Sequence, residues 1–378
     1  MKIGLVCPYN IAKGGGVQEL VFAVQAELIA RGHDVKIVTP LPRDMEEPAE
    51  HPGVIYIGTS TDFRSPMHTH VQISASADMD KVKAMLEEEQ FDILHFHEPW
   101  IPVLSRQILQ RSKSVNIATF HAKVPETLMS RTVIKVVTPY LKSVMKYLHV
   151  LTAVSDSAAE YVTGLTDEPV TIIPNGIDLT KYRVARPKKA TKEKTLLFIG
   201  RLEKRKGLKY LLQAYQLLSQ DNPDLKLIIA GNGPDREKLE LLAEDLKLKN
   251  ISFLGYVSDE LKLQLLSEAD LFVSPAPYGE SFGIVLLEAM ATGTVCVAGN
   301  NSGYSDVMQG PGAISIVNTQ DTEEFARRMR MLLEEDSLRE LWCNWAKDYV
   351  KQFNYSYIVD DYEELYKSVL KQHGHQDK

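Results

Sequence analysis

The chain contains little cysteine and no long apolar run. Its 378 residues include three cysteines, Cys7, Cys296 and Cys343, an odd number at wide spacing. This pattern fits neither a disulfide framework nor a zinc site and is typical of a reducing compartment, so we expect a cytoplasmic protein. No stretch reaches about 18 uncharged apolar residues, and the apolar run before Pro8 is short for a secretory signal. The sequence therefore predicts neither a bilayer-spanning helix nor a targeting peptide.

An excess of positive charge is also missing. The 43 Lys and Arg residues are outnumbered by 50 Asp and Glu residues, which gives a formal charge of -7. This balance argues against a general nucleic-acid-binding protein. Hydrophobic residues at 44% and charged residues at 25% match an ordinary globular protein and exclude wholesale disorder. The length predicts about two domains.

Short β-branched runs alternate with helical patterns as far as about residue 320. In the first half the runs lie at 2–7, 34–39, 54–57, 91–96, 115–120 and 150–154. In the second half they lie at 195–200, 225–231, 251–255, 270–275, 294–299 and 313–317. This alternation is typical of βαβ units. The predicted fold class is α/β, with two Rossmann-like domains, each built on a doubly wound parallel sheet.

A segment rich in proline, glycine and charge separates the two halves, and we place the boundary near Pro174. We expect residues 1–173 and the C-terminal helix 356–378 to form one domain, and residues 174–355 to form the other. Open α/β sheets bind ligands at the carboxyl ends of their strands, so we expect the site in a cleft between the domains.

The first glycine-rich motif is GGGVQ, residues 14–18, between a predicted strand and a predicted helix. A glycine turn that opens a helix leaves backbone N–H groups available to an anion such as a phosphate. Gly15 and Gly16 are therefore candidate phosphate contacts. An ordinary tight turn is the alternative, because the motif lacks the GxGxxG spacing of dinucleotide-binding proteins.

The second motif is GRLEKRKG, residues 200–207, directly after a predicted strand. Arg201 offers a planar guanidinium and Lys206 a mobile charge, and together they suit a diphosphate. A solvated basic loop is the alternative. We expect Lys204 and Arg205 to be solvated.

The stretch PYGESFGIVLLEAM, residues 277–290, carries Glu280 in a turn and Glu288 in an apolar run. An unpaired buried charge is costly, so Glu288 needs a partner, either a ligand such as a ribose diol or a protein cation. On a helix beginning near Phe282 the two carboxylates lie roughly 12 Å apart, which suggests opposite ends of one ligand. Ser281, Phe282 and Gly283 would supply N–H groups at the helix start.

Histidines follow two of the predicted strands. His121 comes directly after the strand 115–120, where it could hydrogen-bond a sugar hydroxyl or move a proton; a structural role is the alternative. His95 and His97 share one face of another strand, but no third ligand has metal-site spacing. We therefore predict no metal site.

The segment 126–150 combines helical apolar spacing with positive charge in an acidic chain. Its basic residues and the one before it are Lys123, Arg131, Lys135, Lys142 and Lys146, against a single acidic residue, Glu126. Such a segment suits an anionic membrane surface. A helix with one core-facing and one solvated side is the alternative.

Four motifs follow one another along the chain in this order: GGGVQ, FHA, GRLEKRKG and the pair of glutamates eight residues apart. With this order the chain resembles the retaining GT-B glycosyltransferases of the glycogen-synthase-like family four group. Further landmarks are PNGID, AGNGPDREKLE and FLGYVSDEL. The start VCPYN and the stretch PYGESFGIVLLEAMATGT look most like bacterial phosphatidylinositol mannosyltransferases.

The resemblance implies roles for individual residues. Arg201 and Lys206 would bind the donor diphosphate, Glu288 the ribose and Glu280 the transferred sugar. The implied catalytic residues are His121, Glu280, Arg201 and Lys206. The implied donor-binding residues are Gly15, Gly16, Gly231, Ser281, Phe282, Gly283, Ile284 and Glu288. The implied acceptor-binding residues are Tyr9, Gln18 and Lys123.

The resemblance also implies an activity. We expect transfer of mannose from GDP-mannose to a lipid such as phosphatidylinositol, with retention of configuration and no required metal or cofactor. The enzyme would act peripherally at the anionic inner face of the plasma membrane. Transfer of glucose from UDP-glucose to diacylglycerol or another acceptor is an alternative within the class. A sugar-nucleotide epimerase and a nucleotide-sugar-binding regulator without turnover are alternatives of other classes.

Overall fold

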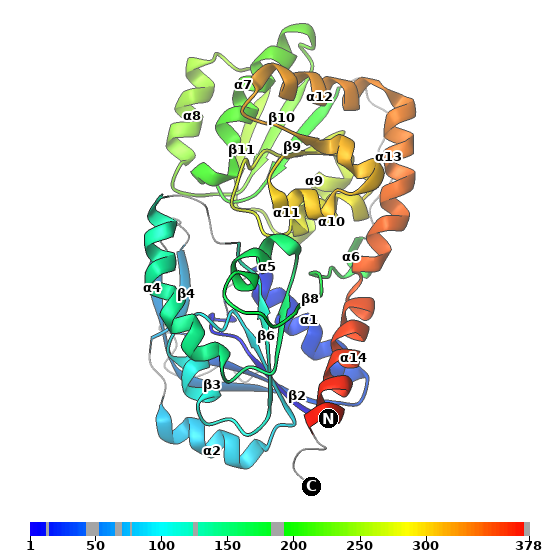
Figure 1. Ribbon diagram of the computed structural model, residues 1–378. Helices are drawn as coiled ribbons and strands as arrows, with labels where there is room; N and C mark the ends of the chain where they lie inside the picture. The colour runs from blue at the N-terminus through cyan, green and yellow to red at the C-terminus, as the bar shows by residue number, and fades with distance from the viewer. Residues whose placement is uncertain are drawn as a thin grey trace. The chain divides into compact units, whose positions relative to one another are not determined.

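The computed structural model describes residues 1–12, 15–42, 53–64, 70–75, 78–123, 128–182 and 193–373. The chain divides into two compact units, the first comprising Met1–Gly176 and Tyr355–Lys378 and the second Ile177–Asn354. Each unit contains one α/β sheet (Figure 1).

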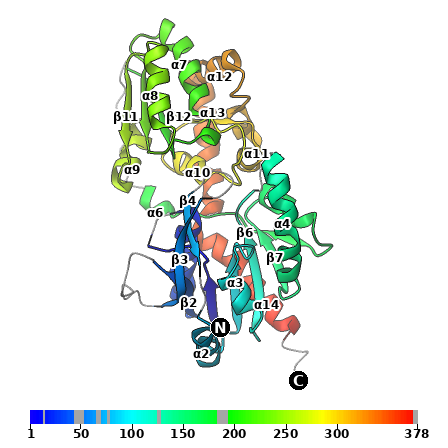
Figure 2. The ribbon, with the colours of Figure 1, turned by 90° about the vertical axis from the view of Figure 1, so that its left-hand side faces the viewer.

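Unit 1 is built on an eight-stranded sheet of order β4-β3-β2-β1-β5-β6-β7-β8. The strands are β1 (Lys2–Val6), β2 (Asp34–Leu41), β3 (Val54–Arg64), β4 (His70–Ser74), β5 (Ile93–His97), β6 (Val115–Phe120), β7 (Val150–Ala153) and β8 (Val170–Ile172). All neighbouring pairs are parallel except β3 and β4, which are antiparallel at one edge (Figure 2). The six strands expected in this half are confirmed. The edge strands β4 and β8 were missed; each pairs with a single neighbouring strand.

Helices cover both faces of this sheet. They are α1 (Gly16–Ala30), α2 (Met79–Glu89), α3 (Leu104–Leu109), α4 (Leu128–Met145), α5 (Asp156–Thr163) and α14 (Tyr355–His373). Side chains alternate along each strand, so Leu5 packs into the core under α1 and α14, while Val6 packs into the core under α2, α3 and α4. This alternation places a helical layer on each side of the sheet.

The C-terminal helix α14 packs against α1. Its buried side chains are Ile358, Val359, Tyr362, Tyr366 and Val369, and they share one core with the buried face of α1. Burying a side chain of this size stabilises the fold by about 1.5–3 kcal/mol. About 180 residues of sequence separate this helix from the rest of its unit, yet its apolar face completes the core of unit 1.

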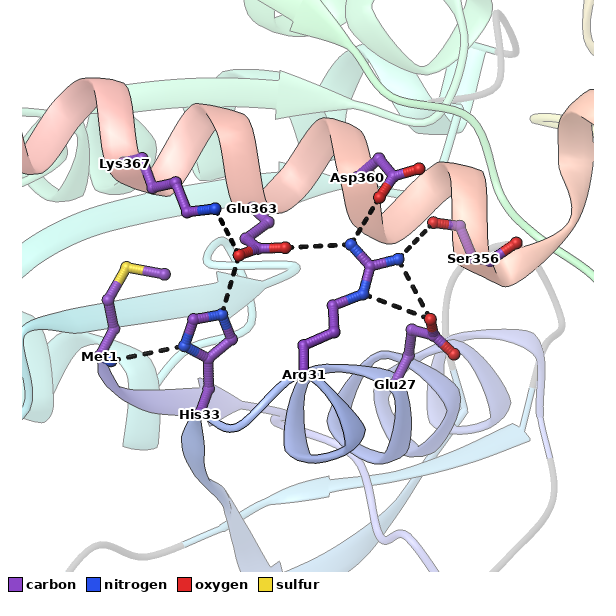
Figure 3. A network of polar contacts seen from close by, with 8 residues as sticks. All are labelled: Met1, Glu27, Arg31, His33, Ser356, Asp360, Glu363 and Lys367. Carbon is purple, nitrogen blue, oxygen red and sulfur yellow. Dashed lines mark hydrogen bonds and ion pairs between the residues drawn. The ribbon is translucent and has the colours of Figure 1, made fainter.

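Arg31, at the end of α1, binds α14 through its guanidinium (Figure 3). Its guanidinium lies 2.6 Å from Asp360 Oδ1, 3.0 Å from Glu363 Oε2 and 3.1 Å from Glu27 Oε1. It also donates to the backbone oxygen of Ser356 at 2.7 Å. A planar guanidinium with five N–H donors is suited to such a fan of acceptors.

Unit 2 contains a six-stranded sheet of order β11-β10-β9-β12-β13-β14. The strands are β9 (Thr195–Ile199), β10 (Lys226–Ala230), β11 (Ile251–Gly255), β12 (Leu271–Ser274), β13 (Cys296–Gly299) and β14 (Ile316–Val317). Every pair is parallel, and the six strands expected in this half are confirmed. The α/β fold class, with two parallel-sheet domains, is therefore confirmed.

The helices of unit 2 are α6 (Leu179–Tyr182), α7 (Leu208–Asp221), α8 (Arg236–Asp245), α9 (Asp259–Glu268), α10 (Ile284–Ala291), α11 (Ser302–Val307), α12 (Thr322–Glu334) and α13 (Asp336–Tyr349). Short 3₁₀ turns lie at η1 (Lys204–Lys206), η2 (Gly310–Ser315) and η3 (Val350–Phe353). Within the described ranges of both units, no helix is long and apolar enough to cross a membrane.

Candidate active site

The sheet order of unit 2 brings two sequence motifs together. The chain leaves β9 toward β10 and β11 on one side and returns to place β12 on the other side of β9. Ligands bind open α/β sheets at such a switch point, beyond the carboxyl ends of the strands. The motif GRLEKRKG follows β9, and the loop that carries Glu280 follows β12.

The backbones of these two loops touch. Gly207 has a φ of 71°, and a Cβ at this position would lie 2.2 Å from the backbone oxygen of Pro275. Gly231, at the end of β10, has a φ of 133°, and its Cβ would lie 1.9 Å from the backbone oxygen of Gly200. Only glycine fits both the conformation and the space at either position.

Glu280 is the meeting point of two cations from the loop after β9. Its Oε1 atom lies 2.8 Å from Lys206 Nζ and 2.6 Å from Arg205 Nη1. Arg205 also donates to the backbone oxygen of Gly279 at 3.0 Å. The expectation that Arg205 is solvated is therefore wrong: its side chain is 24% exposed and holds the loop after β12.

Glu203 is a second carboxylate in this cluster, and it is buried. Its side chain is 3% exposed, and it lies between Arg205, with Nε 2.5 Å from Oε1, and Arg201, with Nε 3.5 Å from Oε2. Arg201, Arg205 and Lys206 therefore share two carboxylates, which leaves a net positive cluster at the switch point. Such a cluster is suited to an anionic ligand.

Glu288 lies on α10 and has protein partners. Its Oε1 atom lies 2.8 Å from Lys262 Nζ on α9 and accepts a hydrogen bond of 2.9 Å from the hydroxyl of Tyr182 on α6. These contacts supply the partner that its buried position requires. The helix begins at Ile284 and not near Phe282, because Gly283 before it has a φ of 113°.

The same topology recurs in unit 1, where the switch point lies between β1 and β5. Tyr9 follows β1, and Gly15 caps the start of α1. Gln18, in the first turn of α1, donates from Nε2 to the backbone oxygen of Asn10 at 3.3 Å. Gly14 of the predicted motif lies outside the described residues, whereas Gly16 is the first residue of α1.

His121, directly after β6, belongs to a buried group of histidines. Its Nε2 atom lies 3.0 Å from Nδ1 of His97, and its side chain also hydrogen-bonds Asn175. The nearby His95 hydrogen-bonds Tyr366 on α14 and Thr119, each at 2.6 Å. Burial lowers the pKa of His95 and of His121 to about 3, so both rings are neutral near pH 7.

Glu98 fixes the backbone of the loop that carries His121. Its Oε1 atom accepts a hydrogen bond of 2.7 Å from the N–H of His121, and its other oxygen accepts one from Nε1 of Trp100. Glu98 is 1% exposed and has a φ of 52°. The sequence interpretation missed this role, although HFHE places an acidic residue at the end of a strand.

Lys123, predicted near an acceptor, has a partner within unit 1. Its Nζ atom lies 3.1 Å from Glu160 Oε2, and its side chain is 15% exposed. On α4, Leu141 and Val144 are buried, whereas Lys135 and Lys142 are exposed, as is Lys146 just beyond its end. The helix therefore has a core-facing side and a basic solvated side.

Among the residues with described positions, no group of three or more His, Cys, Asp or Glu side chains is arranged to hold a metal ion. The predicted site residues fall into two groups, one in each unit. In unit 2, Lys206 pairs with Glu280, and Arg201 contacts Glu203 in the same loop as Lys206. Gly231, after β10, lies against the backbone of Gly200, after β9. In unit 1, His121 lies directly after β6 and Gln18 lies in the first turn of α1.

Comparison with known proteins identifies the class of this arrangement. Residues 14–181 match the family described as Glycosyltransferase Family 4, and residues 183–349 match the family described as Glycosyl transferases group 1. A phosphatidyl-myo-inositol mannosyltransferase from Mycolicibacterium smegmatis is 32% identical over 98% of this chain and 94% of its own length. The chain belongs to the GT-B glycosyltransferases with family 4 and group 1 domains.

Further relatives and solved structures agree with this family assignment. The phosphatidyl-myo-inositol mannosyltransferase of Mycobacterium leprae is 31% identical, over 98% of this chain and 97% of its own. Among solved structures, sucrose-phosphate synthase from Thermosynechococcus elongatus has a TM-score of 0.79 at 20% identity, covering 98% of this chain and 99% of its own. Anabaena HepE in complex with UDP has a TM-score of 0.75 at 18% identity, covering 97% and 100%. The enzyme is therefore a glycosyltransferase with the GT-B fold.

Proposed function

We propose that this glycosyltransferase moves mannose from GDP-mannose to an inositol phospholipid, with retention of configuration. Full-length similarity to enzymes named phosphatidyl-myo-inositol mannosyltransferases carries the proposal. The cationic cluster at the switch point of unit 2 supports it, because a nucleotide-sugar donor brings a diphosphate that must be neutralised as it departs.

Arg201 and Lys206 are assigned to this diphosphate. Glycosyl transfer develops positive charge on the sugar and negative charge on the leaving group, so fixed cations beside the leaving group lower the barrier. Arg201 contacts Glu203 through Nε, and this contact does not use its two terminal amino groups. Backbone groups after β10 and at the start of α10 are assigned to the same donor. They belong to Gly231, Ser281, Phe282, Gly283 and Ile284.

The carboxylates are assigned to the two other parts of the donor. Glu280, beside Lys206, would accept hydrogen bonds from hydroxyls of the transferred mannose. Glu288, on α10, would accept hydrogen bonds from the ribose, in addition to those from Lys262 and Tyr182. An ionised carboxylate has about four acceptor positions, so a ligand can join the existing partners.

Unit 1 would hold the acceptor and the reacting carbon. A neutral His121 would hydrogen-bond a sugar hydroxyl by exchanging its contact with His97 or Asn175, and it does not act as a charged acid near neutral pH. Gly15 and Gly16 would approach the donor phosphates at the start of α1. Tyr9, Gln18 and Lys123 are assigned to the acceptor; for Lys123 this requires exchange of its ion pair with Glu160 for the phospholipid.

The acceptor lipid places the enzyme at a membrane surface. We assign contact with an anionic inner leaflet to the exposed lysines of the α4 region, Lys135, Lys142 and Lys146. Each basic residue near such a surface contributes about 1 kcal/mol of attraction.

The test is a product analysis with paired donors and acceptors. The purified full chain is incubated with GDP-mannose, UDP-glucose or UDP-galactose and with vesicles containing phosphatidylinositol, phosphatidylglycerol or diacylglycerol, and the products are identified by mass spectrometry. We expect a mannosylated inositol lipid from GDP-mannose alone among the donors. The Arg201→Ala variant is the control for background hydrolysis.

Three results would contradict the proposal. Equal use of GDP-mannose and UDP-sugars would remove the assigned donor. A glucosylated diacylglycerol would support the alternative acceptor and donor. An altered nucleotide sugar formed in the absence of any lipid would indicate an epimerase.

A further inference from the structure

Arg205 connects two loops of unit 2, those after β9 and β12, through one guanidinium. Nε lies 2.5 Å from Glu203 Oε1, in the loop after β9, and Nη1 lies 2.6 Å from Glu280 Oε1, in the loop after β12. Nη1 also donates to the backbone oxygen of Gly279 at 3.0 Å. The residues Arg205 and Glu280 are 75 positions apart in sequence.

The chemistry of these contacts favours arginine over lysine. A planar guanidinium can address two carboxylates along two different directions at the same time, whereas a lysine ammonium is a single point charge on a flexible stem. Lys206 contacts the same Oε1 atom of Glu280, so Glu280 retains one cation when Arg205 is replaced. Glu280 would lose the contact with Arg205, which fixes the direction of its carboxylate.

Glu203 gives the cluster its other fixed point. It is buried and contacts both Arg205 and Arg201. Separating a buried carboxylate from its neighbouring cations is costly, because it leaves charges unpaired. Glu203 therefore anchors two guanidiniums that extend to different places: Arg205 to Glu280, and Arg201 to the region assigned to the diphosphate.

We propose that Arg205 is a positioning residue that orients the carboxylate of Glu280 toward the transferred sugar, with Glu203 as its anchor. This inference rests on the proposed function of Arg201, Lys206 and Glu280. It separates three of the four cations of the loop by task. Arg201 and Lys206 act on the diphosphate, whereas Arg205 acts on the sugar through a carboxylate.

The role of Arg205 can be measured by comparing the Kd values of two ligands that share a diphosphate. GDP and GDP-mannose are titrated by calorimetry into the full-length wild-type enzyme and into Arg205→Lys, which preserves the charge. We expect the Kd of GDP to change less than about 2-fold in Arg205→Lys, because its diphosphate contacts remain. We expect the Kd of GDP-mannose to rise roughly 10-fold, and kcat for mannose transfer to fall by a similar factor, since charge-assisted contacts of this kind are directional.

A double-mutant cycle distinguishes positioning from independent effects. Because Arg205 acts through Glu280, Arg205→Lys should add less than about 2-fold to the GDP-mannose Kd of Glu280→Gln. Lys204→Ala is the matched control, because Lys204 is an exposed cation of the same turn. It should leave both constants unchanged. Thermal melting of every variant checks that the fold is retained, and Arg205→Gln replaces Arg205→Lys if the latter does not fold.

Different outcomes separate this inference from the proposed function. If Arg205→Lys weakens GDP and GDP-mannose equally, or if its effect multiplies with that of Glu280→Gln, the positioning role is overturned. If Arg201→Ala and Lys206→Ala leave the Kd of GDP unchanged, the assignment of the diphosphate fails instead.

Discussion

Glu98 Oε1 accepts a hydrogen bond of 2.7 Å from the backbone N–H of His121, which joins the end of β5 to the end of β6. The hydrogen bond fixes the loop that carries the neutral His121 ring. Burial raises the pKa of Glu98 to about 8, outweighing the backbone hydrogen bonds from His121 and Ala122 that favour the charged form. The carboxyl group is therefore a titrating part of the fold.

This pKa predicts a falling stability with rising pH. The unfolded chain loses the Glu98 proton near pH 4.5, whereas the folded protein keeps it up to about pH 8. The stabilisation from this proton is therefore lost as the pH rises toward 8. Between pH 6.5 and 8 the buried His95, His97 and His121, whose pKa values are lowered, oppose this effect in part, because the unfolded chain still loses their protons there. Comparison with a variant that lacks the Glu98 proton therefore isolates the contribution of Glu98. We expect this contribution to fall by about 1–2 kcal/mol over that pH range.

Urea unfolding of wild type and Glu98→Gln measures this effect. Because glutamine does not titrate, the free energy of unfolding of Glu98→Gln relative to wild type should rise by about 1–2 kcal/mol between pH 6.5 and 8. An identical slope in the two proteins would show that Glu98 is not the titrating group.

Arg31 is predicted to be a main attachment of the C-terminal helix. Replacing it by alanine leaves Glu27, Asp360 and Glu363 without their shared cation, and we expect the free energy of unfolding to fall by about 2–3 kcal/mol. Chemical denaturation followed by circular dichroism measures the loss. The control is Arg327→Ala, because Arg327 is 64% exposed and forms an ion pair with Glu324 on the same helix. An exposed pair of this kind contributes less than about 1 kcal/mol, so equal losses in the two variants would contradict the role of Arg31.

Glu288 is predicted to recognise the ribose of the donor. We expect Glu288→Gln to raise the Kd of GDP roughly 10-fold, because a hydrogen bond to a charged group contributes about 1.5–3 kcal/mol. The same variant should also lose the wild-type preference for GDP over 2′-deoxy-GDP, measured by calorimetry. If it keeps that preference and only melts at a lower temperature, Glu288 serves the fold through Lys262 and Tyr182.

Gly231 is predicted to be irreplaceable for steric reasons. In Gly231→Ala the new Cβ would lie 1.9 Å from the backbone oxygen of Gly200, so β9 and β10 must separate at their carboxyl ends. We expect a loss of more than about 2 kcal/mol in stability, together with weaker GDP binding. Gly293→Ala is the matched control, because Gly293 also has a positive φ of 76° but no atom within 4 Å of its Cβ position. It should cost only about 1 kcal/mol, and a similar loss in both variants would exclude the steric explanation.

Membrane contact is predicted to depend on the lysines of the α4 region. We expect Lys135→Glu, Lys142→Glu and Lys146→Glu, combined in one protein, to abolish sedimentation with vesicles that contain anionic lipid. The wild type should sediment with anionic vesicles and not with neutral ones, and less so at high salt.

The control for this experiment carries the same change of charge elsewhere. Lys238, Lys247 and Lys249 are exposed lysines of unit 2, and their combined replacement by glutamate should leave sedimentation unchanged. Equal loss of binding in the two triple variants would indicate nonspecific attraction, and no sedimentation of the wild type would defeat the prediction.

The strands were predictable because their signal is local. The run at 195–199 is apolar and is bounded by glycine, and it forms β9 in the centre of its sheet. β8 was not predictable in this way, because Thr171 and Ile172 are exposed and only pairing with β7 makes the segment a strand. The start of α10 was misplaced by two residues, since the φ of Gly283 cannot be read from its identity.

The candidate site was predictable in its residues but not in its pairings. Lys204 and Arg205 are adjacent, and the sequence interpretation treated both as solvated. The structure leaves Lys204 exposed and places Arg205 between Glu203 and Glu280. Similarly, the need of Glu288 for a partner followed from its apolar surroundings, but the partners, Lys262 and Tyr182, did not.

The sequence by itself determined the α/β class, the order of the motifs along the chain and the kinds of side chain at the strand ends. Periodicity and backbone preference act over a few residues, so these features are encoded where they occur. Only the tertiary structure decided which charges meet. That outcome depends on which strands become neighbours in the sheet, as when β12 returns beside β9 and brings Glu280 to Arg205. Contacts between residues so distant in sequence are set by burial of the whole core and leave no local pattern.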